Sequence, residues 1–277
     1  MTARGECDIA LSRGVLREGL AALEAFGDLL GLRRVGPRAL DRAKSDTCDA
    51  CTSLVAALEP FERTLVVALG KTPEAESMLR ALGERIRSHV APIAEALRDP
   101  APISARRRLA LETVFRKHRS EFKDCLTLCE LVVAAVTTVP VELDVLELFE
   151  NVQVERIVDT PVIRVGIDVV RSVPFCADRH VLMGLVEAAA TFVCQNGSGQ
   201  VRLIAGTNDA GASMMRLTPA PRGWVMPKKS IVLPMRGQAD LAVDVARVVA
   251  ARTGLGVTFD PATLSASIVT NSRGGPC

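Results

Sequence analysis

Apolar side chains recur every three or four positions through the first half of the chain, which is the period of one face of an α-helix. The first such stretch runs from residue 11 to 32 and carries Leu16, Leu20, Leu23, Phe26 and Leu30. Ser45 and Asp46 are good capping residues for a second helix that ends near Leu69. The same spacing returns from Pro73 to about Arg98 and from Ala105 to Thr137. We therefore expect four helices before residue 138.

The last two of these helices form a hairpin over residues 71–138. Thr72 and Pro73 are typical of a helix start, and Asp99-Pro100-Ala101-Pro102 separates the two arms. The second arm carries a heptad-like apolar seam: Leu111, Phe115, His118, Phe122, Cys125, Cys129, Val132 and Val136. Such a seam needs another helical surface, and a second copy of the hairpin is the simplest supplier. The pattern thus predicts a homodimeric four-helix bundle, with residues 1–70 as N-terminal helices of unknown role.

After Pro140 the pattern becomes mixed. Short helices are expected over 144–156, 178–194 and 238–252. Alternating or apolar runs predict strands over 162–170, 200–206, 212–218, 257–260 and 264–270. This order predicts an α/β sandwich over residues 139–273, with helices on one face of a mixed sheet. The whole chain is then an α+β protein.

Composition narrows the classes of protein that fit this pattern. Hydrophobic residues make up 48% and aromatic residues 3% of the 277 residues, so we expect an aliphatic core. The net charge of +2 gives no reason to expect nucleic acid or an anionic membrane as a partner. The longest apolar run, 131–136, is far shorter than a membrane span, and no secretory signal is visible. We expect a cytoplasmic protein whose eight cysteines are reduced.

Three segments of the second half resemble the core of the histidine kinase superfamily. They are PVELDVLELFENV (140–152), ADRHVLMGLVEAAATFV (177–193) and ADLAVDVARVVAARTGLGVTFDP (239–261). With the preceding hairpin, the resemblance covers roughly residues 74–271 and rests on the order of elements more than on identity. It implies a helical hairpin for dimerisation and phosphotransfer, followed by a kinase-type (Bergerat-like) ATP-binding domain.

The positions at which this family binds ATP are replaced. The middle helix presents Ala and Phe where the family has asparagine for Mg²⁺, and alanine offers no ligand; the residues there are Glu187, Ala188, Ala190, Thr191 and Phe192. Thr218–Gly223 stands in place of the adenine-reading Asp box, and Gly237 alone survives of the second glycine box. We therefore expect no cofactor and no ATP-dependent kinase activity. Degenerate cores of this kind are similar to bacterial histidine phosphotransferases and pseudo-histidine kinases, which dock receiver domains of response regulators.

A phosphotransferase needs an accessible imidazole, and the chain has three histidines. His89 lies in RIRSHVAPIAEAL (85–97), which resembles the phosphoacceptor segment, with Pro92 one turn later. It also borders an apolar row, so a histidine beside the core is the alternative. His118 is the runner-up, and Glu121 one turn away could orient its ring, although its place in the seam also fits a packed or interface histidine. His180 begins a later helix and is expected to be structural.

Two further groups are candidates for partner contacts. Arg116, Lys117, Arg119 and Lys123 make a basic strip that could dock the acidic pocket of a receiver domain, or simply be solvated. Trp224 could contact a partner or fill the vacated nucleotide site.

The cysteine pairs Cys48/Cys51 and Cys125/Cys129 admit a zinc or redox interpretation. Both pairs lie in segments with helical periodicity, where the cysteines are expected to be small, buried apolar side chains. We therefore expect no metal site. The leading hypothesis is a phosphotransferase-like signalling protein that docks receiver domains without ATP. The alternatives are a non-catalytic dimeric adaptor that binds another protein through the ATP-like domain and, more weakly, a cysteine-based metal or redox sensor.

Overall fold

The computed structural model describes residues 3–32, 36–99, 101, 103–150, 162–169, 173–196, 199–235 and 237–270. The chain divides into two compact units, Met1–Glu130 and Leu131–Cys277. The first is helical and the second combines helices with a mixed sheet, so the predicted α+β class is confirmed.

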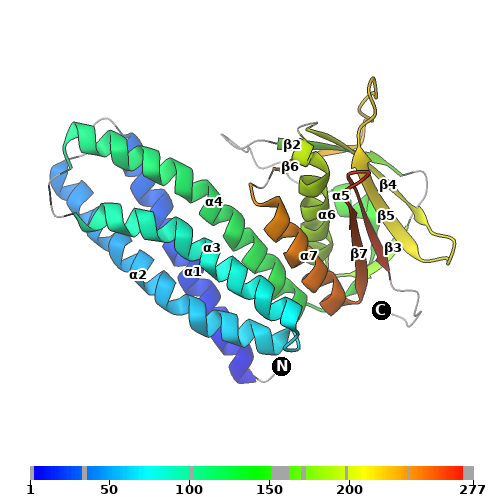
Figure 1. Cartoon of the computed structure of the whole chain (residues 1–277), viewed down its shortest axis with the longest axis horizontal. Helices are drawn as coiled ribbons and strands as arrows, with labels where there is room; N and C mark the ends of the chain where they lie inside the picture. The colour runs from blue at the N-terminus through cyan, green and yellow to red at the C-terminus, as the bar shows by residue number, and fades with distance from the viewer. Residues whose placement is uncertain are drawn as a thin grey trace. The chain divides into compact units, whose positions relative to one another are not determined.

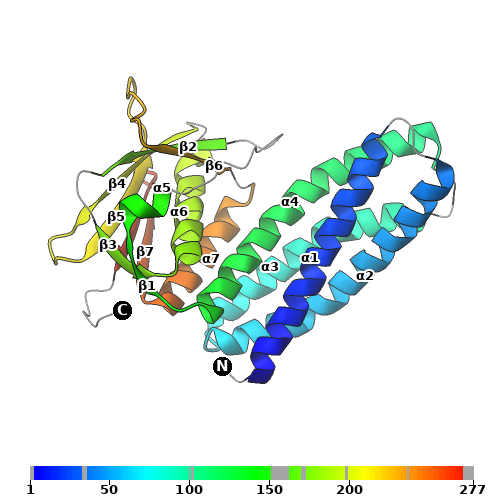
Figure 2. The ribbon, with the colours of Figure 1, turned by 180° about the vertical axis from the view of Figure 1, so that it is seen from behind.

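The first unit is built from long antiparallel helices. These are α1 (Ala3–Gly31), α2 (Pro37–Ala68), α3 (Pro73–Arg98) and the part of α4 (Ala105–Thr137) that precedes residue 131. Figures 1 and 2 show the four helices running side by side. Their facing sides form an aliphatic core with few aromatic rings, including Leu23, Leu54, Leu58, Leu65, Leu79, Leu82, Phe115 and Phe122.

The helix starts follow simple capping rules. Thr72 caps α3 by accepting a hydrogen bond from the backbone N–H of Ala75, and Pro73 occupies the first turn, as predicted. Helix α2 begins earlier than expected, because Gly36 and Pro37 form its N-terminus instead of a spacer. Ser45 and Asp46 therefore lie inside α2 and cap nothing.

Within the first unit, the apolar seam of α4 from Leu111 to Cys129 is covered by helices of the same chain. The ring of Phe115 lies 5.0 Å from the ring of Phe26 on α1, measured between centroids. Near the end of the unit, Arg17 on α1 donates to Glu130 on α4 at 2.7 and 2.9 Å. We expected a second copy to supply this surface. The helices of residues 1–70 supply it instead, because each carries an apolar face of its own. Dimerisation remains a prediction.

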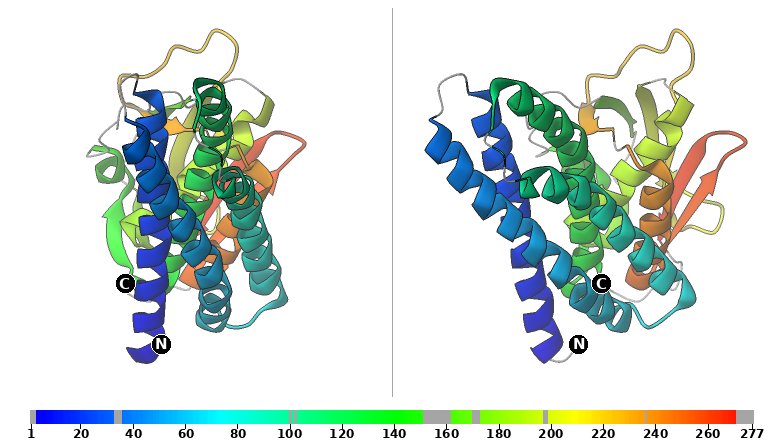
Figure 3. Two further views of the ribbon diagram at one scale, coloured as in Figure 1. Left: turned by 90° about the vertical axis from the view of Figure 1, so that its left-hand side faces the viewer. Right: turned by 60° about the vertical axis from the view of Figure 1, so that its left-hand side comes forward.

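The second unit holds a six-stranded mixed sheet in the order β6-β2-β4-β5-β8-β7. Its strands are β2 (Val162–Asp168), β4 (Gln200–Thr207), β5 (Ser213–Pro219), β6 (Ser230–Pro234), β7 (Leu255–Asp260) and β8 (Ser265–Thr270). The β2–β4 pair is parallel and the other pairs are antiparallel. Helices α6 (Arg179–Val193) and α7 (Ala239–Thr253) lie next to each other on one face of this sheet, as Figure 3 shows.

Burial along the strands alternates as a sheet with one covered face requires. On β2, Ile163, Val165 and Ile167 are buried, whereas Arg164 is exposed and Asp168 is half-buried. The predicted strands at 200–206, 212–218, 257–260 and 264–270 are all present within a few residues.

Several elements of this unit were not predicted. Strands β1 (Val141–Asp144) and β3 (Pro174–Ala177) pair as a separate small sheet, and β6 adds an edge strand beside β2. Each of these strands is only four or five residues long, which is too short for an alternating apolar pattern to be recognised in the sequence. The helix expected over 144–156 is α5 (Val145–Glu150); Asp144 ends β1, and residues 151–156 lie outside the described residues.

Candidate functional site

The two leading histidines, which lie 29 residues apart in the sequence, meet between α3 and α4. Nδ1 of His89 lies 3.3 Å from Nδ1 of His118, and the ring centroids are 5.6 Å apart. This is hydrogen-bond distance, so one imidazole donates and the other accepts. The sequence suggested His89 and His118 as alternative phosphoryl acceptors. In the structure their imidazole rings lie within hydrogen-bond distance of each other.

The helical periodicity explains why the rings of His89 and His118 approach each other. His89 stands one residue before the fully buried Val90, and His118 stands between the buried Phe115 and Phe122. Both histidines therefore sit at the edge of the core, where α3 and α4 face each other. Each is half-buried, and the side chain of His89 is 13% exposed. His89 thus lies beside the core, as one interpretation expected, and at the same time next to the other candidate histidine.

Glu121 completes the cluster. Its Oε2 atom lies 4.0 Å from Nε2 of His89, across the interface between the two helices. We expected Glu121 to orient His118 on its own helix; its negative charge acts on both rings and opposes the lowering of each pKa. We name His89, His118 and Glu121 the histidine cluster.

Burial and nearby cations favour neutral imidazoles. Burial lowers the pKa of His89, and the positive charges of Arg85 and Lys117 lower it further, while Glu121 acts in the opposite direction. Burial also lowers the pKa of His118, and Lys117 adds to this effect, while Glu121 again acts in the opposite direction. Both rings therefore keep a basic nitrogen lone pair at neutral pH. The part played by Arg85 was not anticipated, although its position one turn before His89 could have suggested it.

The predicted basic strip is divided by local ion pairs. Arg116 binds Glu112 one turn away at 2.8 Å, and Arg119 lies 3.4 Å from Asp28 on α1. Lys117 and Lys123 are exposed. At 100° per residue, Lys123 points about 140° away from His118 around the α4 axis. Of the four residues, Lys117 is thus the one whose charge acts on both histidines.

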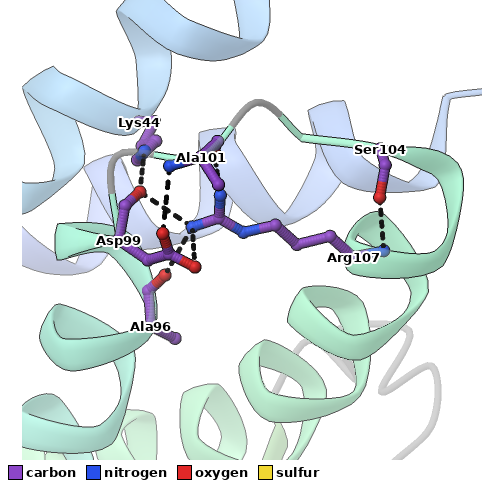
Figure 4. Close-up of polar contacts among 6 residues, drawn as sticks. All are labelled: Lys44, Ala96, Asp99, Ala101, Ser104 and Arg107. Atoms are coloured by element: carbon purple, nitrogen blue, oxygen red, sulfur yellow. Dashed lines mark hydrogen bonds and ion pairs between the residues drawn. The ribbon is translucent and has the colours of Figure 1, made fainter.

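Other arginines of α4 stabilise the helix ends. Figure 4 shows Arg107 at the α3–α4 turn, where it binds the carbonyl oxygens of Ala96, Asp99 and Ala101 and the carboxylate of Asp99. Arg108 reaches the last carbonyls of α1, donating from Nε to Leu30 at 2.6 Å. These guanidinium groups complete helix C-termini, a structural role that the sequence pattern did not reveal.

Trp224 lies on the sheet face opposite α6 and α7. A side chain at Gly166 of β2 would collide with the Trp224 ring, Met226 and Pro227. Gly166 lies between Val165 and Ile167, whose buried side chains face the helices, so it points to the other face. The indole packs against β2 at this position, and the two interpretations of Trp224, a partner contact or a filled nucleotide site, remain predictions. The neighbouring Val225 is 84% exposed.

The residues of α6 at which the resemblance would place nucleotide binding are largely packed in the interior of the second unit. Ala188, Ala190 and Thr191 are buried, and Phe192 packs edge-on against Phe259 of β7 with ring centroids 5.2 Å apart. Glu187 is half-buried on the same helix. His180 lies at the start of α6, where its backbone N–H donates to the capping Asp178. These packed side chains include no array of oxygen ligands suited to Mg²⁺.

The described cysteines are mostly buried thiols. Cys48, Cys51, Cys125, Cys129 and Cys194 form no disulfide, and Cys176 is disulfide-bonded, against the expectation that all are reduced. Burial raises the pKa of Cys51 to about 11 and raises that of Cys129 as well, which disfavours the thiolate needed for redox chemistry or metal binding. Within the described part of the chain, no cluster of three or more His, Cys, Asp or Glu residues is arranged to hold a metal ion.

Among the described helices, none has the length and apolarity that crossing a membrane requires. Comparison with known proteins adds no identification: no protein-family model matches the chain, and no curated protein matches its sequence.

Proposed function

We propose that this chain is a two-component-type signalling protein, similar to a histidine phosphotransferase, that docks response-regulator receiver domains without using ATP. The observation that carries the proposal is the 3.3 Å approach of the His89 and His118 imidazoles at the partly exposed junction of α3 and α4. A phosphotransferase needs a neutral, oriented imidazole beside positive charge, and this junction combines both.

The electrostatics of the junction suit an aspartyl phosphate. Arg85 and Lys117 carry positive charge close enough to lower the pKa of His89. The transferred phosphoryl group is anionic, so the same charges favour its arrival. Arg116, Arg119, Lys123 and Trp224 remain proposed partner contacts, with Arg116 and Arg119 also engaged in ion pairs within the chain.

The second unit supports the proposal through its order of elements. Helix, strand, helix, two strands, helix and two strands follow one another as the resemblance to the kinase core implies, with β1, β3 and β6 added. The packed face of α6 supports a Bergerat-like domain retained without nucleotide chemistry. In this proposal the domain is a docking surface.

Phosphoryl transfer is tested with ³²P-labelled receiver domains. The purified chain is mixed with a panel of phosphorylated receivers, and an acid-labile, base-stable label on the chain is sought. We expect the label to disappear when His89 and His118 are both replaced by Ala and to persist in the His180→Ala control. Absence of label with every receiver would reject the transfer function.

A second candidate is a non-catalytic adaptor that binds another protein through the second unit. The exposed Val225 beside Trp224 favours it. Next to this segment lies a hollow of about 150 Å³, lined by Leu146, Phe149, Ile167, Lys228, Lys229 and Ser230. Receiver binding without any label, weakened by Val225→Asp but unaffected by the histidine replacements, would favour the adaptor.

A further inference from the structure

We infer that the phosphoryl acceptor of this chain is Nε2 of His118, and that His89 and Glu121 act as positioning residues that set the tautomer of His118. The inference rests on the proposed function and reverses the order in which the sequence ranks the two histidines. It follows from the polarity of the hydrogen bond that joins them.

The Nδ1–Nδ1 contact requires unlike atoms. At 3.3 Å, one Nδ1 must carry the proton and the other must present its lone pair, because two protonated nitrogens would repel each other. The neutral rings favoured at this site can meet the requirement in two ways. Either His89 donates and His118 accepts, or the reverse holds.

Glu121 selects between the two arrangements. Its carboxylate lies 4.0 Å from Nε2 of His89, and a negative charge there favours a proton on that nitrogen. A neutral His89 protonated at Nε2 has its lone pair on Nδ1. His118 must then donate its Nδ1–H to His89, which leaves the lone pair of His118 on Nε2.

The resulting order is Glu121, His89, His118, with the unprotonated nitrogen at the far end. Glu121 also acts on His118; of the cations, Lys117 on α4 acts on both rings and Arg85 on α3 acts on His89. These cations oppose a second proton on either ring and so maintain the neutral tautomers. The positive charge of Lys117, which acts on His118, also favours the arrival of an anionic phosphoryl group at that ring.

The transfer step balances without a further reactant. The Nε2 lone pair of His118 forms a bond to phosphorus while the bond from phosphorus to the aspartyl oxygen breaks. The electron pair of that bond leaves with the receiver's aspartate, which becomes a carboxylate. The imidazole gains positive charge, which its Nδ1–H shares with Nδ1 of His89 through a strengthened hydrogen bond. Glu121 stabilises the partial positive charge that reaches His89.

The first test measures tautomers and involves no phosphoryl transfer. With three histidines in the chain, selective ¹⁵N-histidine labelling and long-range ¹H–¹⁵N correlation at pH 7.5 resolve each ring, and His→Gln variants assign the signals. We expect the Nδ1–H form for His118 and the Nε2–H form for His89. Glu121→Gln should weaken this preference, while Glu112→Gln, whose carboxylate pairs with Arg116, should not change it. The opposite tautomers would overturn the inference.

The second test uses phosphoramidate, a small phosphoryl donor that needs no receiver domain. Mass spectrometry and ¹H–³¹P correlation should place the label on Nε2 of His118. His89→Ala should slow labelling by about 10- to 100-fold, the usual range when an orienting partner is lost. His89→Asn should restore much of the rate, because an Asn oxygen can replace Nδ1 as the acceptor.

The outcomes separate this inference from the proposed function. Label on His89, label on Nδ1 of His118, or no label on either histidine would overturn the inference. Label on Nε2 of His118 from phosphoramidate, without transfer from any phosphorylated receiver, would support the acceptor assignment and reject the signalling role.

Discussion

The indole of Trp224 occupies the space that a side chain at Gly166 would need. An added Cβ atom at Gly166 would lie 2.3 Å from the Trp224 ring and 2.6 Å from Pro227, well inside contact distance. The glycine therefore allows the segment before β6 to close over β2. This relationship holds the one tryptophan of the chain against the sheet.

Replacing Gly166 should release this contact. Gly166→Ala is expected to displace Trp224 and to lower the free energy of unfolding by about 1–3 kcal/mol, the usual cost of overpacking. With a single tryptophan, the displacement appears as a red shift and stronger acrylamide quenching of its fluorescence. Gly206→Ala on β4 is the control, because no atom lies within 4 Å of an added Cβ there. An unchanged spectrum in Gly166→Ala would contradict the close contact.

A second glycine makes room for an ion pair in the helical unit. An added Cβ at Gly83 would overlap the carboxylate of Glu62, which binds Arg87 at 2.7 Å. Gly83→Ala should therefore lower the free energy of unfolding by about 1–3 kcal/mol in urea denaturation. Gly14→Ala is the matched control in α1, where the space is open and helix propensity favours Ala by up to about 1 kcal/mol. Stabilisation by both substitutions would show that Glu62 moves away freely.

Arg108 should matter more for stability than its basic neighbour Arg106. Its guanidinium group donates to the carbonyl oxygens of Leu29 and Leu30 and so completes the end of α1. Arg108→Ala leaves those carbonyls without this partner, and we expect a loss of about 1.5–3 kcal/mol. Arg106 is exposed, so Arg106→Ala should change the stability by less than about 0.5 kcal/mol. Equal effects in thermal denaturation would contradict the capping role.

The histidine cluster predicts a stability loss in mild acid. Both histidines have a pKa below the usual 6.5, so the unfolded chain binds protons that the folded chain resists. This contribution is complete above pH 6.5 and falls as the pH drops below that value. Burial raises the pKa of Glu62, so protonation of Glu62 increases the stability as the pH falls. Glu62 is present in every variant compared, so its effect cancels in the comparison. Urea denaturation between pH 7.5 and 5 should show a smaller decline for His89→Gln/His118→Gln than for the unmodified chain. Parallel declines would refute this prediction.

Thiol reactivity should follow burial. Cys51 and Cys129 are buried with raised pKa values, whereas Cys48 is half-buried. In the native protein, iodoacetamide at pH 7.5 should modify Cys48 well before the other two, as peptide mass spectrometry would measure. All three should react at similar rates in 6 M guanidinium. Rapid native modification of Cys129 would revive the redox-sensor hypothesis.

Local sequence signals predicted most of the elements but not all of the helix limits. The Thr72-Pro73 start and the strand periods after Pro140 are local, so they could be read directly. Helix α2 was placed too late because Ser45 and Asp46 are good caps in isolation. A cap acts only where the helix ends, and here the preceding Gly36-Pro37 already begins it.

For the candidate site, the sequence identified the residue types but not their relationship. Periodicity placed His89 and His118 near the core edges of two helices, and that position follows from 3.6 residues per turn. Their pairing depends on the axial register of α3 against α4, to which packing along the whole interface contributes. Two histidines 29 residues apart reveal nothing of that register.

The amino-acid sequence alone was enough for the helical first half, the mixed second half and the three histidines available for chemistry. Each of these depends on residue type and on neighbours within a few turns. Tertiary packing decided that helices of the same chain cover the α4 seam within the first unit, that Glu121 lies 4.0 Å from His89 on the facing helix, and that Trp224 lies against Gly166 of β2. Those outcomes depend on which apolar faces bury each other, a property of the folded chain as a whole that short-range patterns do not encode.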